Sequence, residues 1–206
     1  MGQPEAAETR GSSRRAKIIA AATDTFAEMG FHGASLRDIA ARAGLSHPGL
    51  LHHFPTKAAL LEAVLAAREA EQGEFMSEQM ARGASGIESM LLLLERNQRR
   101  RKLLAVYTTL AGEATSPDHP AHDFFLGRNE RALVNYEQAI REQQALGYLA
   151  PGVDPAVAAR NAVALVLGLQ LHWLMSLTDP SAEEVDIAAH LEAYYRSILP
   201  GWTREA

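Results

Sequence analysis

Hydrophobic side chains recur every three or four residues through most of the chain, and this spacing predicts amphipathic helices. Near the N-terminus one such face is formed by Ile19, Ala22, Phe26 and Met29. Gly30 is expected to end that helix, and residues 1–12, which lack periodicity, are predicted to form a flexible tail. No segment shows the valine- and isoleucine-rich alternation of a strand, so the pattern indicates an all-α fold.

Two short helices are predicted next, at residues 36–43 and 47–54, separated by a turn at residues 44–46. Ser35 and Asp38, three residues apart, form a pair similar to a capping box at the start of the first helix. That helix is expected to bury a stripe of Leu36, Ile39, Ala40 and Ala43. Gly44 suits the left-handed conformation that closes a helix. Ser46 is expected to cap the second helix, so the segment forms a helix-turn-helix.

The remainder of the chain continues the helical pattern. A long helix is expected from Thr56 to about Gln79, followed by helices near residues 87–97, 101–115, 121–146, 155–177 and 182–199. The breaks between the later helices are rich in glycine, proline and aspartate. We therefore predict a three-helix head of residues 13–56 and a larger helical body of residues 57–206, with residues 57–79 as the connecting helix.

The second helix of the helix-turn-helix is too short to bury much surface. Leu50 and Phe54 are its main inward side chains, so its other side is available to something outside the fold. A helix N-terminus favours phosphate, and an exposed helix face fits the major groove of DNA. Spacing alone leaves a second interpretation open, in which the segment is a packing helix between two longer ones.

Composition narrows the class of protein. Hydrophobic residues make up 47% and charged residues 22%, as in ordinary soluble proteins, and the absence of cysteine excludes disulfides and thiolate chemistry. The N-terminus lacks the apolar run of a signal peptide. The most apolar stretch, residues 162–177, is interrupted by polar side chains and is shorter than the ~20 residues of a membrane helix. We expect a cytoplasmic protein that does not enter a membrane.

The net charge of -5 is unevenly distributed. Residues 1–66 carry seven Lys and Arg against six Asp and Glu, a net charge of +1. Residues 67–206 carry thirteen against nineteen, a net charge of -6. This asymmetry permits a DNA-binding head on an acidic body.

The segment from Arg15 to about Val64 resembles the N-terminal domain of the TetR family of transcriptional regulators. The family's phenylalanine-alanine-x-x-glycine-phenylalanine pattern is matched by Phe26, Ala27, Gly30 and Phe31. Its phenylalanine-x-x-lysine ending is matched by Phe54 to Lys57. The later run EATSPDHPAHDFFLGR is similar to a pattern in regulators with a BetI-like C-terminal domain. The resemblance implies a ligand-responsive repressor rather than an enzyme.

The resemblance also implies a set of DNA contacts. The candidates are Ser35, Arg37, Ser46, His47, Pro48, Gly49, His52, His53 and Lys57. His47 stands where the family often has a lysine or arginine, and Lys57 is expected to clamp a phosphate. Leu51 replaces the family's usual tyrosine and cannot bond a phosphate, so His52 and His53 are the candidates to replace that contact.

Two histidine-rich segments raise the question of a metal site. His47, His52 and His53 diverge on a helix, so no zinc site is expected there. The run from Asp118 to Asp123 holds two imidazoles and two carboxylates, although turn and helix-start chemistry explains it more simply. A helical-bundle metalloprotein built on that run is the alternative function, and a non-DNA adaptor is a third; we expect no metal and no cofactor.

The apolar segment at residues 162–177 needs cover on more than one side. The last helix adds a stripe of Ile187, Leu191, Tyr194, Tyr195 and Ile198. Together these last two helices are predicted to form a homodimer, which would read palindromic operator DNA. A mostly apolar small-molecule effector is expected in the body, with candidate lining residues Tyr107, Phe124, Phe125, Tyr136, His172, Trp173 and Met175.

Overall fold

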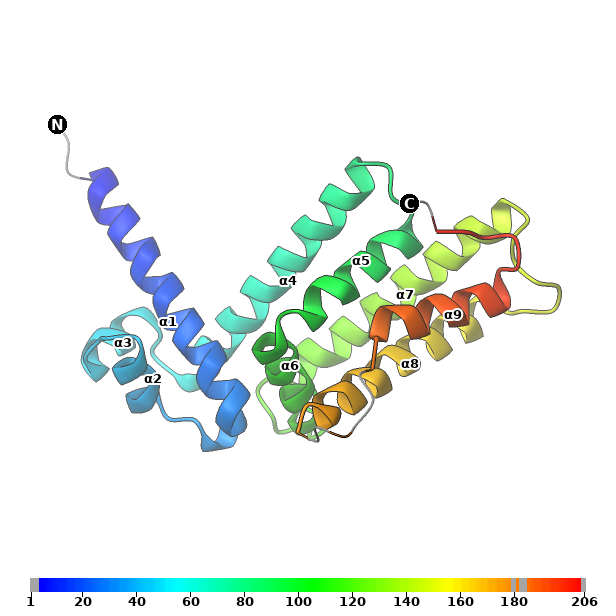
Figure 1. Ribbon diagram of the computed structural model, residues 1–206. Coiled ribbons are helices and arrows are strands. Elements are labelled where there is room, and N and C mark those ends of the chain that lie inside the picture. Colours follow the sequence, from blue (N-terminus) through cyan, green and yellow to red (C-terminus); the bar gives the residue numbers. More distant parts are fainter. Residues whose placement is uncertain (1–3, 179–180, 182–184, 205–206) are drawn as a thin grey trace. The chain divides into compact units, whose positions relative to one another are not determined.

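The computed structural model describes residues 4–178, 181 and 185–204 (Figure 1). Within those residues every regular element is a helix, which confirms the predicted all-α fold. The helices are α1 (Pro4–Gly33), α2 (Leu36–Arg42), α3 (His47–His53), α4 (Lys57–Ala81), α5 (Gly86–Gln98), α6 (Arg101–Glu113), α7 (His122–Ala145), α8 (Pro155–Ser176) and α9 (Ile187–Ile198). Residues 182–184 of the predicted last helix lie outside the described residues.

The chain divides into two compact units. The head unit comprises Met1–Ala70 and Ala105–His122, and the body unit comprises Glu71–Leu104 and Asp123–Ala206. This division differs from the predicted boundary between residues 56 and 57. The first half of α4 joins the head unit because it buries an apolar face made of Leu60, Leu61, Val64 and Leu65.

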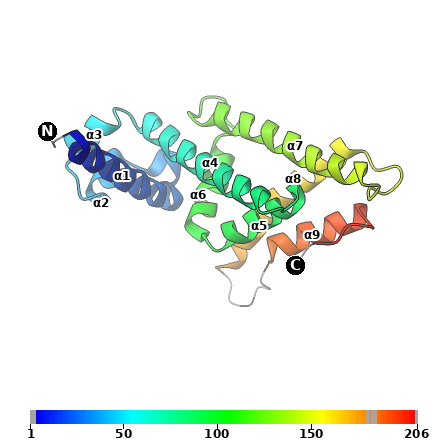
Figure 2. The ribbon, with the colours of Figure 1, turned by 90° about the horizontal axis from the view of Figure 1, so that it is seen from above.

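In the head unit, α1 packs against α2 and α2 against α3 (Figure 2). Ile18, Ala22 and Phe26 of α1 are fully buried. Met29, predicted on the same face, is 49% exposed, and the helical path ends at the next residue, Gly30, which has φ 67° and ψ -178°. The helix begins at Pro4 and so includes most of the predicted tail, since an existing helix extends at low cost through alanine and glutamate.

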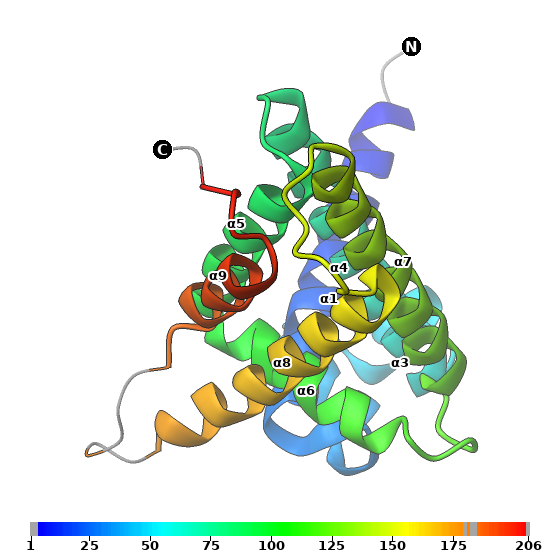
Figure 3. The same cartoon turned by 90° about the vertical axis from the view of Figure 1, so that its right-hand side faces the viewer.

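In the body unit, α9 packs against α5 and α8 (Figure 3). The predicted stripe on α9 belongs to this packing: Ile187, Leu191 and Tyr195 are core residues, with Tyr194 and Ile198 packed against them. Ile187, Leu191 and Tyr195 are therefore used within the chain, whereas Tyr194 and Ile198 remain half-buried.

Helix α8 has two apolar faces. One face enters the core of the body unit through Ala162, Val166 and Trp173. The opposite side exposes Val157 (58%), Leu167 (47%), Leu171 (44%) and Met175 (61%). By length and composition alone α8 would be able to cross a membrane, a test that core helices of soluble proteins also pass. The predicted need for cover on more than one side is thus visible in the structure.

Candidate nucleic-acid interface

The turn between α2 and α3 is closed by backbone hydrogen bonds at α2 and by a serine cap at α3. Leu45 N–H donates to Ala40 O at 2.9 Å and Gly44 N–H donates to Ala41 O at 3.1 Å, the pattern of a Schellman motif. Gly44 has φ +69° and open space where a Cβ would lie, so backbone conformation, not crowding, favours glycine there. Ser46 Oγ then accepts the N–H of Gly49 at 3.2 Å and starts α3.

The start of α2 is fixed in the same way. Ser35 Oγ accepts the N–H of Asp38 at 3.2 Å and donates to the Asp38 carboxylate at 2.6 Å. The predicted helix caps at Ser35 and Ser46 are therefore confirmed as local structure. Together with the closed turn they define the starting points of both helices of the motif.

Helix α3 is held by one face and leaves the other available. Leu50 is fully buried and Phe54, the residue that ends the helix, is 3% exposed, so the predicted inward pair is confirmed. Among the predicted DNA contacts on or before α3, Ser46, Pro48 and His52 are exposed, whereas His47, Gly49 and His53 are half-buried. On α2, Arg37 is exposed, and Ser35 before it is half-buried.

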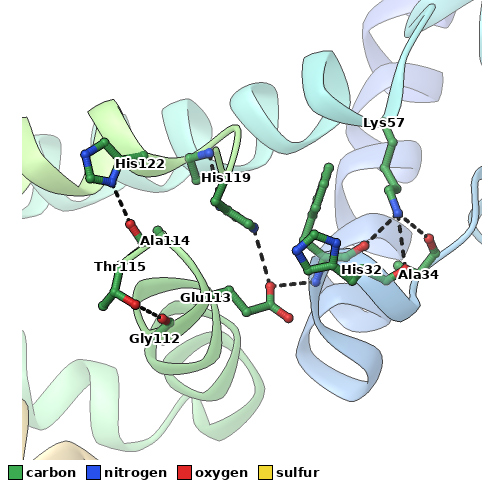
Figure 4. Close-up of polar contacts among 11 residues, drawn as sticks. His32, Ala34, Lys57, Gly112, Glu113, Ala114, Thr115, His119 and His122 are labelled. Carbon is green, nitrogen blue, oxygen red and sulfur yellow. Dashed lines mark hydrogen bonds and ion pairs between the residues drawn. The ribbon is translucent and has the colours of Figure 1, made fainter. Parts of the chain in front are cut away.

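Lys57 is placed differently from the predicted phosphate clamp. Its Nζ donates to Phe31 O at 2.7 Å, to Ala34 O at 2.9 Å and to His32 O at 3.4 Å (Figure 4). The ammonium also lies 4.4 Å from the centroid of the Phe31 ring. The carbonyls at the end of α1 lack helical partners and carry the negative end of the helix dipole, so an inward ammonium is stabilised there.

A second charged group reaches the same residue from α6. Glu113 Oε2 accepts the N–H of Phe31 at 2.9 Å, across 82 positions of the sequence. His119, whose side chain is 1% exposed, brings Nε2 to 3.5 Å from the same carboxylate oxygen. Figure 4 shows Glu113 between His119 and the end of α1. Sequence reasoning missed Glu113, because a glutamate near the end of a predicted helix has no local mark of a distant partner.

The histidines of the run from Asp118 to Asp123 are engaged with the protein itself. His119 Nδ1 accepts the N–H of Ala121 at 3.2 Å, and burial lowers the pKa of the His119 imidazole. His122 Nδ1 lies 2.8 Å from Ala114 O and therefore donates to it. Across the described part of the chain, no three His, Cys, Asp or Glu side chains lie together in a way that would hold a metal ion.

Comparison with known proteins finds a family match for each of two segments of the chain. Residues 18–64 match the pattern described as bacterial regulatory proteins of the tetR family, and residues 86–200 match the C-terminal domain of BetI-type transcriptional repressors. The chain belongs to the TetR family of transcriptional regulators. The resemblance found in residues 15–64 and in the later BetI-like run is thereby confirmed.

Individual relatives agree with this membership. RutR of Escherichia coli K12 is 50% identical over 54 residues, a match that spans only 26% of the length of RutR. UidR of the same strain is 26% identical over 204 residues, covering 94% of this chain and 95% of UidR. The crystal structure of NalD, a repressor of a multidrug efflux pump in Pseudomonas aeruginosa, superposes with a TM-score of 0.67 at 26% identity, covering 93% of this chain and 99% of NalD.

The residues predicted to line an effector site in this TetR-family protein are distributed over both units. Tyr107 belongs to the head unit, where its hydroxyl donates to Leu65 O at 3.1 Å. In the body unit Trp173 is 5% exposed, and burial raises the pKa of Tyr136 to about 12. Both residues belong to, or pack against, one apolar cluster.

The other predicted effector residues lie nearer the surface of the body unit. Phe124 and Phe125 are half-buried and contact each other edge to face, with ring centroids 5.2 Å apart. His172 and Met175 are exposed on α8. Ser89, which the sequence did not single out, is fully buried, and its Oγ has no hydrogen-bond partner among the residues that the structure describes. Its only sequence signal is a hydroxyl within an apolar helical run.

Proposed function

We propose that this TetR-family regulator is a cytoplasmic, ligand-responsive repressor that binds palindromic operator DNA as a homodimer. The observation that carries the proposal is the capped helix-turn-helix, whose second helix has seven residues and a single buried one, Leu50. A helix held by so little of its surface leaves most of its side chains for an external partner. In a chain of this family, that partner is the major groove of duplex DNA.

The proposed contacts divide into two classes. His47, Pro48 and Gly49 at the start of α3 are assigned to base edges and the groove wall. Ser35, Ser46, Arg37, His52 and His53 are assigned to phosphates. Lys57 is assigned an indirect role, because its ammonium already bonds three backbone carbonyls.

Selection of bound fragments from genomic DNA, followed by affinity measurements over a salt series, tests the DNA-binding proposal. A specific site with two inverted half-sites about one helical turn apart is expected. The logarithm of the affinity should fall linearly with the logarithm of salt concentration, by about 0.9 for each phosphate contact. Failure to enrich any sequence, together with a flat salt response, would remove DNA binding and favour a protein-binding adaptor.

The exposed side of α8 supports the homodimer. Its apolar members Val157, Leu167, Leu171 and Met175 lie on one side of the helix, and exposed apolar side chains gathered on one face can mark an interaction site. A second copy related by a two-fold axis would bring the same surface against itself. We place His172, which is exposed on the same helix, at this interface and not in an effector site.

Substitution on α8 tests the dimer. Leu171→Glu introduces a charge into the proposed interface and should convert dimers into monomers and weaken binding to a full operator. Val134→Glu is the matched control, since Val134 is 66% exposed on α7. Sedimentation velocity gives the mass of each variant. A Leu171→Glu protein that keeps the wild-type mass would show that α8 does not form the interface.

The buried hydroxyl of Ser89 in the body unit supports the effector proposal. Figure 1 shows α5 and α7 running in opposite directions, and a Cβ on Gly86 would lie 3.1 Å from Ala139 Cβ. Because the helices are antiparallel, one turn toward the C-terminus of α5 corresponds to one turn toward the N-terminus of α7. This register brings Ser89 of α5 toward Tyr136 of α7. Buried hydroxyls normally have partners, and in the described part of the chain Ser89 Oγ has none. We infer a mostly apolar effector carrying one hydrogen-bonding group for this position.

A melting-temperature screen of small molecules identifies candidates for this effector, and DNA affinity measured with each stabilising compound tests regulation. A coupling of about 1–3 kcal/mol would weaken DNA binding roughly 5- to 150-fold at saturation. Ser89→Ala and Tyr136→Phe should reduce this response while preserving DNA affinity without the compound. An unchanged response in both variants would place the effector elsewhere.

A further inference from the structure

Two helices of this protein cross the division between the body unit and the head unit. Helix α4 begins at Lys57 in the head unit and passes into the body unit after Ala70. Helix α6 begins at Arg101 in the body unit and ends at Glu113 in the head unit. The head ends of both helices, Lys57 and Glu113, are charged, and both side chains contact Phe31.

The peptide groups of Phe31 are held from two directions. Glu113 Oε2 accepts the Phe31 N–H at 2.9 Å, and Lys57 Nζ donates to the Phe31 carbonyl at 2.7 Å. The ring of Phe31 contacts His119 edge to face, with centroids 5.1 Å apart, and Phe26 at 6.0 Å. Phe31 lies between the helical part of α1 and the start of α2, so these contacts fix the point from which the helix-turn-helix leaves α1.

Gly30 makes the approach of Glu113 possible. A Cβ on Gly30 would lie 2.2 Å from Glu113 Oε1, which is closer than any non-bonded contact. Gly30 also has φ +67°, a conformation that costs an L-residue about 1 kcal/mol or more. The turn therefore requires glycine for two reasons: the positive φ of Gly30 and the Glu113 carboxylate packed directly against its Cα.

His119 packs against the other side of the carboxylate. Because its Nδ1 accepts the N–H of Ala121, the proton of the neutral imidazole is on Nε2. His119 Nε2 lies 3.5 Å from Glu113 Oε2 without forming a hydrogen bond among the described residues, and the His119 side chain is 1% exposed. Burial lowers the pKa of the His119 imidazole, against the opposing effect of the Glu113 carboxylate. The carboxylate is thus confined between Phe31, Gly30 and His119.

We propose that Glu113 is a positioning residue for DNA recognition, which fixes through the Phe31 amide the point where the helix-turn-helix leaves α1. The proposal rests on the DNA-binding function proposed above. Loss of either hydrogen bond to Phe31 would free the connection between α1 and α2 to turn. The orientation of α3 in the groove then depends on Glu113 at the end of α6 and on Lys57 at the start of α4.

Three variants test the role of the carboxylate in binding to a selected operator fragment. Glu113→Ala removes the acceptor and should weaken DNA binding at least about tenfold, a loss typical of a hydrogen bond to a charged group. Glu113→Gln retains an acceptor oxygen and should restore affinity to within about threefold of wild type. Glu62→Gln is the charge-matched control on the exposed side of α4 and should leave affinity unchanged.

Gly30→Ala, measured in the wild-type and Glu113→Ala backgrounds, tests whether the contact itself is responsible. The added methyl displaces the carboxylate only where the carboxylate is present, so its effect on DNA affinity should be smaller in Glu113→Ala. Amide hydrogen exchange at Phe31 should accelerate in Glu113→Ala and remain slow in Glu113→Gln.

The outcomes separate this proposal from the function on which it rests. A wild-type protein that binds no duplex refutes the proposed function. A wild-type protein that binds, with Glu113→Ala equally tight or with additive effects of the two substitutions, overturns the role of Glu113 alone. Loss of affinity in Glu113→Ala that Glu113→Gln does not rescue would also overturn it, since charge and not hydrogen bonding would then be responsible.

Discussion

Leu50 and Leu51 are adjacent leucines on α3 with opposite surroundings, and truncating each to alanine isolates what holds this helix. Leu50 is fully buried and is the only buried residue within the seven-residue helix, whereas Leu51 is half-buried. A fully buried leucine changed to alanine costs about 2–5 kcal/mol, because the lost contacts and the cavity add. Leu51→Ala should cost about 1 kcal/mol, in proportion to its smaller buried area.

Urea unfolding followed by circular dichroism measures the free energy of unfolding of both variants. Binding to an operator fragment measures their DNA affinity. Total stability of a domain is about 5–15 kcal/mol, so Leu50→Ala removes a large share of it. Because α3 has few other contacts, Leu50→Ala should also lower DNA affinity at temperatures where the rest of the protein is folded. Equal losses of stability in Leu50→Ala and Leu51→Ala would refute the argument that Leu50 anchors the helix.

Three further predictions follow from single side chains. Lys57→Met should lower the melting temperature, because three carbonyls lose their donor, while the salt dependence of DNA binding keeps its slope; a slope smaller by about 0.9 would instead identify a phosphate contact. The pKa of His119 is lower in the folded protein than in the unfolded chain. Below pH ~6.5 the unfolded chain therefore binds a proton at this histidine more readily than the folded protein does, so the free energy of unfolding should fall as the pH drops below that value. His119→Asn, which cannot titrate, should show a flatter pH dependence of unfolding between pH ~7 and ~5, and an unchanged slope would contradict the assignment. Leu51→Tyr restores a hydroxyl that this chain lacks, and fluorescence anisotropy should show operator binding about 2- to 10-fold tighter, with no gain if α3 keeps that position away from phosphate.

The sequence by itself determined the local elements of this regulator. Helical spacing predicted the all-α fold, and the serine caps and Gly44 predicted the helix-turn-helix. Each depends on residues within a few positions of one another, so the information is present in a short window. Leu50 and Phe54 were also identified as inward residues, because a helix of two turns has few choices for its buried face.

Only the tertiary structure decided what the charged and aromatic side chains contact. Lys57 looked like a phosphate ligand by position, yet its ammonium closes the end of α1. His172 looked like a polar group inside an apolar helix, yet it is exposed on α8, because the buried face of that helix is set by the helices packed against it.

The partner of Glu113 lies 82 residues away, and the head unit takes residues 105–122 from the middle of the chain. Periodicity gives the face of a helix but not its neighbour, since many pairings of amphipathic helices bury similar areas. Long charged side chains reach acceptors that only the folded backbone creates, such as the free carbonyls at the end of α1. Their roles therefore follow from packing between distant segments.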